Sequence, residues 1–231
     1  MPDLSLRLST IASLVPDGAR VCDVGTDHGY LAIHLKTDGK VKSIIAADIN
    51  PLPLQNAAKN IEKAGVTGIE LRLCDGLSGI SPEETDTVII AGMGGEVISG
   101  IIERGFSVAK QKDKILILQP TTSPEALRKF LQTNGFEILK EVPILENGKL
   151  YSVMLVKYSG NSYESPEYFY YVGKVSPNVK SGLMYIEKQQ KRCLECANAL
   201  KNVPEKQKDY LYYKNVLEGI NDYLKDNGFG E

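Results

Sequence analysis

Acidic residues and glycines recur directly after apolar runs in the first half of the chain. The run at residues 21–24 contains Asp23 and leads into Gly25-Thr26-Asp27-His28-Gly29; later runs end at Asp48, at Asp75-Gly76 and at residues 91–95, Ala-Gly-Met-Gly-Gly. The carboxyl ends of the strands in an open α/β sheet line one crevice, so we expect these residues to lie together. The spacing predicts a nucleotide-type pocket assembled from four successive loops.

The elements that would position these loops alternate along the chain. Apolar runs near residues 20–24, 43–47, 69–73, 87–91 and 115–118 predict strands, and helical spacing is found at 4–15, 30–35, 51–64, 96–102 and 124–133. The runs at 88–91 and 115–118 do not alternate, as is typical of strands covered on both faces. Residues 136–142 and 150–156, joined through Glu146-Asn147-Gly148-Lys149, predict a closing antiparallel pair. The pattern indicates an α/β fold with a doubly wound, mostly parallel sheet.

The composition changes after Tyr158. Residues 159–162 form a polar linker, and two later segments carry apolar side chains at three-four spacing, from Leu183 to Leu200 and from Tyr210 to Leu224. Two such helices would bury their seams against each other in a short antiparallel hairpin resembling a coiled coil. We therefore divide the chain into a domain at residues 1–158 and a helical domain at 159–231.

Composition excludes several classes of protein. The 231 residues are 42% hydrophobic and 24% charged, and the formal net charge of −2 differs from that of a strongly basic nucleic-acid-binding tail. No apolar run approaches the length of a membrane helix and no secretory leader is recognisable, which favours a cytoplasmic protein without a membrane partner. The four cysteines predict no disulfide. Cys193 and Cys196 have zinc-like spacing without a second ligand pair, so no metal is expected.

Each loop also has a plainer interpretation. Gly25 and Gly29 belong to a turn type that NAD enzymes share, although the G-x-G-x-x-G spacing of those enzymes is absent. Asp48 could cap the helix that starts at Pro51, but Asn50 could cap it equally well. Asp75-Gly76 could be an ordinary turn. The glycines at 92, 94 and 95 are harder to explain by packing, and we expect close backbone approach to a ligand there.

Taken together, the loops resemble one family. The segments Asp23 to Tyr30, Asp48, Asp75-Gly76, Ile90 to Gly95 and Leu118-Gln119-Pro120 are similar to the bacterial tRNA methyltransferases that modify N1 of adenine 22. The resemblance spans nearly the whole chain and weakens after about Ser159, and Thr121 replaces an expected asparagine. It implies a class I methyltransferase, with a Rossmann-like sheet, that binds S-adenosylmethionine and acts on tRNA.

The resemblance also implies roles for individual residues. Gly25, in the loop that begins at Asp23, would border the methionine part of the cofactor. Asp48 and Ile49 would contact the ribose, and Asp75 with Gly76 the adenine. The residues beside the methyl donor would be Ala91, Gly92 and Met93, and Arg7 would reach either the cofactor carboxylate or an RNA phosphate. Asp27 is the expected catalytic residue, because a carboxylate beside N1 and N6 stabilises the positive charge that N1-methylation creates.

Two other functions remain open at this stage. One is an NAD-linked oxidoreductase, against which the missing third glycine counts. The other is a non-catalytic RNA-binding or cofactor-sensing module, against which Asp27 counts. A tyrosine cluster at residues 163–171 could stack on bases, although packing of the tail against the main domain is favoured. The oligomeric state stays open, with a monomer favoured.

Overall fold

The computed structural model describes residues 4–229 and contains one seven-stranded sheet. The strands are β1 (Ala19–Val24), β2 (Val41–Asp48), β3 (Ile69–Leu73), β4 (Thr87–Gly94), β5 (Ile115–Thr122), β6 (Phe136–Glu146) and β7 (Lys149–Tyr158). Their order is β3-β2-β1-β4-β5-β7-β6. The first five are parallel, whereas β7 runs antiparallel to β5 and β6 antiparallel to β7. The expected α/β fold is confirmed, and every predicted strand is present.

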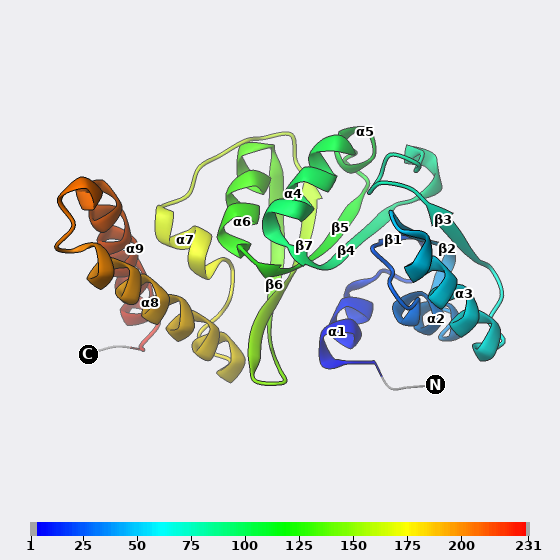
Figure 1. The fold of residues 1–231 in the computed structure, drawn as a ribbon, viewed down its shortest axis with the longest axis horizontal. Coiled ribbons are helices and arrows are strands. Elements are labelled where there is room, and N and C mark those ends of the chain that lie inside the picture. Colours follow the sequence, from blue (N-terminus) through cyan, green and yellow to red (C-terminus); the bar gives the residue numbers. More distant parts are fainter. Residues whose placement is uncertain (1–3, 230–231) are drawn as a thin grey trace.

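Helices cover both faces of this sheet (Figure 1). They are α1 (Leu6–Leu14), α2 (Tyr30–Thr37), α3 (Pro51–Ala64), α4 (Gly95–Arg104), α5 (Phe106–Ala109) and α6 (Pro124–Thr133), with a 3-10 turn at Pro82–Glu84. One core lies between the sheet and α4, α5 and α6, and a second lies between the sheet and α1 and α2. Val88, Ile89 and Ile90 are all 0% exposed, which explains why their run does not alternate.

Local sequence signals set several boundaries. Helix α3 begins with Pro51 and ends before Gly65, whose φ of +65° is the left-handed conformation common after a helix. The hairpin between β6 and β7 turns at Asn147 and Gly148, with φ of +50° and +72°, as a two-residue turn with primed geometry requires. Both elements match their predictions, with the strands longer than expected.

The chain after β7 forms α7 (Glu167–Val172), α8 (Lys180–Leu200), a 3-10 turn at Pro204–Lys206, and α9 (Gln207–Asp226). Helices α8 and α9 pack against each other, and together with α7 they lie at the β6 end of the molecule (Figure 1). The spacing did not predict α7, although its Tyr171 and Val172 belong to the buried cluster of this segment. Tyr168 and Tyr223 also pack together, with ring centroids 6.2 Å apart. Most of the tyrosine cluster thus serves packing.

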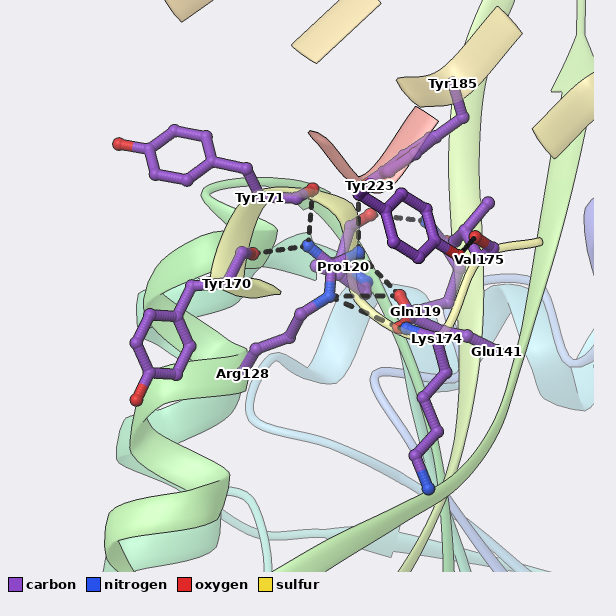
Figure 2. Close-up of polar contacts among 10 residues, drawn as sticks. All are labelled: Gln119, Pro120, Arg128, Glu141, Tyr170, Tyr171, Lys174, Val175, Tyr185 and Tyr223. Carbon is purple, nitrogen blue, oxygen red and sulfur yellow. Dashed lines mark hydrogen bonds and ion pairs between the residues drawn. The ribbon is translucent and has the colours of Figure 1, made fainter. Parts of the chain in front are cut away.

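A buried ion pair joins the tail to the sheet (Figure 2). Arg128 on α6 and Glu141 on β6 are fully buried, and Arg128 Nη1 donates to the carbonyl oxygens of Tyr170 and Tyr171 at 2.6 and 2.9 Å. Its Nη2 donates to the hydroxyl of Tyr185 on α8 at 2.8 Å. The tail is therefore anchored by polar contacts as well as by packing. The division into domains at residues 1–158 and 159–231 stays a prediction. No helix within residues 4–229 is long and apolar enough to cross a bilayer.

Candidate active site

A cleft of about 340 Å³ opens at the carboxyl ends of β1, β2 and β4. Its walls are formed by Arg7, Leu8, Asp23, Gly25, Thr26, Asp27, His28, Tyr30, Leu31, Asp48, Ala91, Gly92 and Met93. The structure thus brings together eight of the residues proposed from the sequence, including one from the lead-in helix α1. Three of the four predicted loops contribute, and the loop after β3 does not.

The loop after β1 brings its backbone close to the opposite wall. Gly25 has a φ of +79°, and a Cβ built on it would lie 2.2 Å from Cε of Met93. The N–H groups of Gly25 and Thr26 both donate to the carbonyl oxygen of Ala47, at 2.8 and 3.1 Å, which ties the loop to β2. Only glycine combines this backbone conformation with the narrow space beside Met93.

Asp27 lies at the tip of the same loop. It is one of three non-glycine residues in the described chain with a positive φ, +48°, and its side chain is 70% exposed. Its Oδ2 is 3.5 Å from Nε2 of His28, whose ring stacks on Tyr30 with centroids 5.4 Å apart. A turn closed by the Gly29 N–H on the carbonyl oxygen of Thr26, at 2.9 Å, presents the carboxylate at the mouth of the cleft.

Two further carboxyl groups lie deeper. Asp23 is 5% exposed and accepts a hydrogen bond from the Thr26 hydroxyl at 2.9 Å. Burial raises the pKa of Asp23 to about 6; the bond from Thr26 opposes this shift, and the nearby Asp48 charge adds to it. Asp48 is 9% exposed, and its Oδ1 accepts from the backbone N–H of Asn50 at 2.8 Å. Asn50 occupies the N-cap position of α3 without a side-chain cap bond.

The sequence-based reasoning did not assign Gln119 a place in the site. This residue is fully buried at the end of β5, and its Oε1 accepts from Arg7 Nη1 at 2.8 Å and from the Gly92 N–H at 3.1 Å. Gln119 therefore fixes both α1 and the loop after β4. Glu146 also holds Arg7, accepting its backbone N–H at 2.8 Å. The feature of the sequence that could have indicated Gln119 is a polar residue directly after the apolar run at 115–118.

The glycines at the end of β4 and the start of α4 have two different explanations. Gly92 has a φ of +80° and lines the cleft, as expected for close approach of a ligand. Gly95, in contrast, is required for packing, because a Cβ there would lie 2.2 Å from the carbonyl oxygen of Ser123. The expectation that all three glycines serve a ligand is thus wrong for Gly95. Its helix α4 approaches the start of α6 too closely for a side chain.

Three predicted site residues do not line the cleft. The side chain of Ile49 is 58% exposed beyond the end of β2. Asp75 is half-exposed and pairs with Arg104, Oδ1 to Nη2, at 3.2 Å. Gly76 packs on α4, where a Cβ would meet Ile101 Cγ2 at 2.9 Å. Their roles stay predictions. No group of three or more potential metal ligands occurs within the described part of the chain.

Comparison with known proteins places this site in a family. Residues 4–154, which contain the sheet and the whole cleft, match the family model described as a methyltransferase domain. The chain belongs to this methyltransferase family. A tRNA (adenine(22)-N(1))-methyltransferase of Bacillus subtilis is 37% identical over 155 residues, covering 67% of this methyltransferase and 65% of the relative. The aligned segment thus spans slightly less than two thirds of that relative.

Solved structures extend the similarity to the tail. A putative tRNA (m1A22) methyltransferase of Streptococcus pneumoniae superposes with a TM-score of 0.83 at 32% identity, covering 96% of this methyltransferase and 100% of that chain. The same pneumococcal protein in complex with S-adenosyl-L-methionine gives a TM-score of 0.76 at 33% identity, covering 93% and 100%. The resemblance stated from the sequence motifs is confirmed, and so is the Rossmann-like class I methyltransferase fold.

Proposed function

We propose that this protein transfers a methyl group from S-adenosylmethionine to N1 of adenine 22 in tRNA, in the cytoplasm. The observation that carries the proposal is the match over 96% of the chain, tail included, with the pneumococcal structure described as a putative tRNA (m1A22) methyltransferase. The Bacillus relative with the same activity in its name supports the same substrate.

The cleft fits S-adenosylmethionine on its own chemistry. Gly25 and Gly92 present backbone without side chains at the cleft wall, and Asp23 and Asp48 offer buried carboxyl groups to an amine or to hydroxyls. Nε of Arg7 is buried and makes no hydrogen bond within the described residues, but it lies 3.6 Å from Oε2 of Glu146. Arg7 would therefore bind an anionic group of the cofactor by loosening this ion pair. These five residues would hold the cofactor, with Gly25 at its methionine part and Asp48 at its ribose.

Other cofactor contacts need rearrangement of side chains. For Asp75 to accept from the adenine amino group, its carboxylate would leave Arg104, and an exposed ion pair of this kind is easily broken. Ile49 would add apolar side-chain surface to the nucleoside site, and Gly76 would add backbone. Ala91 and Met93 would flank the methyl group together with Gly92, as their place in the cleft wall allows.

Asp27 is the residue that would carry the chemistry. S-adenosylmethionine, when bound, supplies a methyl group on a positively charged sulfur, and adenine N1 accepts it with its own lone pair. The base thereby becomes a cation, and the carboxylate of Asp27 would stabilise this charge and accept a hydrogen bond from N6. Since N1 needs no deprotonation, no general base is required. His28, 3.5 Å from Asp27, would help to orient the carboxylate.

The alternative functions lack comparable support. An NAD-linked oxidoreductase would belong to another family, since residues 4–154 match a methyltransferase domain. A non-catalytic module needs no carboxylate at the mouth of the cleft, whereas the geometry holds Asp27 there at a positive φ. A thermal-shift comparison tests the oxidoreductase, because S-adenosylhomocysteine should stabilise the protein and NAD should not. A single-turnover assay on unmodified tRNA tests the non-catalytic module, which would transfer no methyl group.

The direct test is product analysis. The purified full-length protein is incubated with S-adenosylmethionine and an unmodified tRNA transcript, and the nucleosides are separated by mass. We expect 1-methyladenosine, and primer extension should stop at position 22. A transcript with guanine at position 22 is the matched control and should accept no methyl group. Methylation at another nucleotide, or none on any tRNA, would refute the proposed function.

A further inference from the structure

A second cleft, of about 290 Å³, opens on the other side of the loop that follows β5. Three parts of the chain line it: residues 120–124 at the end of β5 and the start of α6, the start of β7 with Tyr151, and one face of α8 with Lys188 and Gln189. It lies where the tail meets the methyltransferase domain, and its volume is near the lower end for ligand pockets. Nothing in the proposed reaction so far uses it.

The two clefts share a wall. Oγ1 of Thr121, which lines the second cleft, donates to the carbonyl oxygen of Met93, which lines the first, at 3.0 Å. Arg7, another residue of the first cleft, lies over the ring of Tyr151 in the second, 5.8 Å from its centroid. Since one layer of residues separates the clefts, a strand with its target adenine at the mouth of the first cleft would bring a neighbouring nucleotide to the second.

Gln189 is a buried amide without a partner. The residue is 5% exposed, and its Oε1 makes no hydrogen bond with any of residues 4–229. A buried carbonyl oxygen of this kind is uncommon in folded proteins and calls for a donor. Its position on α8 is fixed, because the hydroxyl of Tyr185, one turn earlier, is held by Arg128 Nη2 at 2.8 Å (Figure 2). Gln189 therefore lines the second cleft from a rigid element, with its amide oxygen buried and unpaired.

The other groups complete the chemistry of a nucleotide site. The ring of Tyr151 is partly exposed and can stack on a base. Lys188 is exposed at the cleft and forms no ion pair within the described residues, which leaves its ammonium group for a phosphate. Arg192, in contrast, is already paired with Glu125 at 2.7 Å. An amide acceptor, an aromatic ring and a free cation are the groups by which proteins read a nucleotide.

We propose that the second cleft binds a nucleotide adjacent to the target adenine in the same RNA strand. Tyr151 stacks on its base and Lys188 contacts its phosphate. The amide of Gln189 turns its Oε1 into the cleft and accepts a hydrogen bond from an N–H on the base edge. Gln189 is then a residue that determines substrate sequence. Because the occupant belongs to the RNA substrate, the inference rests on the proposed function, and it adds a second nucleotide subsite to it.

The test pairs protein variants with RNA variants. A panel of unmodified tRNA transcripts carries single changes at the nucleotides flanking the target adenine, and single-turnover methylation is measured for the wild type and for Gln189→Leu. We expect one change to slow the wild type by about tenfold, and Gln189→Leu to lose about tenfold on the natural transcript while becoming indifferent to that same change. A Gln189→Leu protein that discriminates like the wild type at every position overturns the assignment.

A second measurement addresses the phosphate contact. Lys188→Ala and the control Lys191→Ala are compared for binding a tRNA transcript in the presence of S-adenosylhomocysteine. Lys191 lies on the same helix, is 78% exposed, and pairs with Glu195. We expect Lys188→Ala to weaken binding by roughly threefold or more and to lower the salt slope by about one, and Lys191→Ala to change neither. Equal effects of the two variants contradict the contact.

The two experiments distinguish failure of the nucleotide site from failure of the proposed function. If the wild type methylates adenine 22 while all variants at 188 and 189 behave like it, the second cleft is not a nucleotide site and the proposed function stands. If the wild type methylates no transcript but Lys188→Ala selectively weakens tRNA binding, the proposed function fails and the RNA contact stands. Thermal unfolding of Gln189→Leu should match the wild type, which excludes misfolding as the cause.

Discussion

Arg128 and Glu141 form an ion pair from which solvent is excluded, with Nη2 and Oε1 2.6 Å apart and both side chains 0% exposed. The pair lies within the methyltransferase domain, yet the remaining donors of Arg128 bind Tyr170, Tyr171 and Tyr185 of the tail (Figure 2). Glu141 also accepts from the backbone N–H of Lys174 at 2.9 Å. One buried pair thus determines how the tail sits against the sheet.

Loss of this arginine should be costly. Arg128→Ala leaves the Glu141 carboxylate buried without its partner, and we expect the free energy of unfolding to fall by about 3 to 5 kcal/mol. Lys129→Ala is the matched control, because that exposed pair with Glu167 contributes no more than about 1 kcal/mol. Denaturant titration measures both. Similar small losses in the two variants would show that the pair does not anchor the tail.

The buried Asp23 should make stability depend on pH. Its pKa is raised by burial to about 6 from 3.8, so between these values the folded state binds a proton that the unfolded state has released. The contribution of Asp23 to the free energy of unfolding should therefore fall as pH rises from about 4 to above 6. We expect the difference between wild type and Asp23→Asn to change by roughly 1 to 3 kcal/mol over this range. A constant difference would mean that Asp23 titrates normally.

Gly25 offers a test of the close approach beside Met93. In Gly25→Ala the new methyl group displaces Met93 into the cleft, and the positive φ adds strain of about 1 to 3 kcal/mol. Gly18→Ala is the control, because Gly18 has a φ of +75° but no atom within 4 Å of its Cβ position. Both variants should lose stability, but only Gly25→Ala should lose affinity for S-adenosylhomocysteine by calorimetry. Equal affinities would remove Gly25 from the cofactor site.

Asp48 should contribute to cofactor affinity. Asp48→Ala removes a carboxylate proposed to bind ribose hydroxyls and should weaken binding of S-adenosylhomocysteine by about 1 to 3 kcal/mol. Asp38→Ala, at an exposed carboxylate paired with His34 outside the cleft, should leave the affinity unchanged. Asp75→Ala is expected to act in the same direction as Asp48→Ala. An Asp48→Ala protein with the affinity of the wild type would contradict the ribose assignment.

Much of the fold could be predicted because local patterns and tertiary structure agree. The strand at 69–73 has the predicted bounds, and the turn at Asn147-Gly148 lies where its residues indicated. In an open α/β sheet the carboxyl ends of the strands line one crevice. This rule alone predicted that Asp23, Asp48 and Gly92 would line one cleft. Both predictions follow from the direction and order of the strands, and the positions of the apolar runs indicate these.

The remainder depends on contacts between distant residues. An arginine on a helix is usually solvated, so nothing local indicated that Arg128 is buried against Glu141 and the tail. The bridge from Gln119 to Arg7 spans 112 positions, and the packing role of Gly95 depends on the backbone of Ser123. Helix α7 is too short for a periodic pattern, although it supplies two of the carbonyl oxygens that hold Arg128.

Asp27 is proposed to stabilise the charge that forms on adenine, and Asp27→Asn removes the carboxylate that would do so. Asparagine tolerates the positive φ of this position and keeps the shape of the side chain, so only the charge is lost. The measurement is the single-turnover rate of methyl transfer to unmodified tRNA at saturating S-adenosylmethionine, with both affinities determined in parallel. We predict a rate about 100-fold or more below that of the wild type, with affinities within a few-fold. A rate close to that of the wild type would contradict the catalytic role of Asp27.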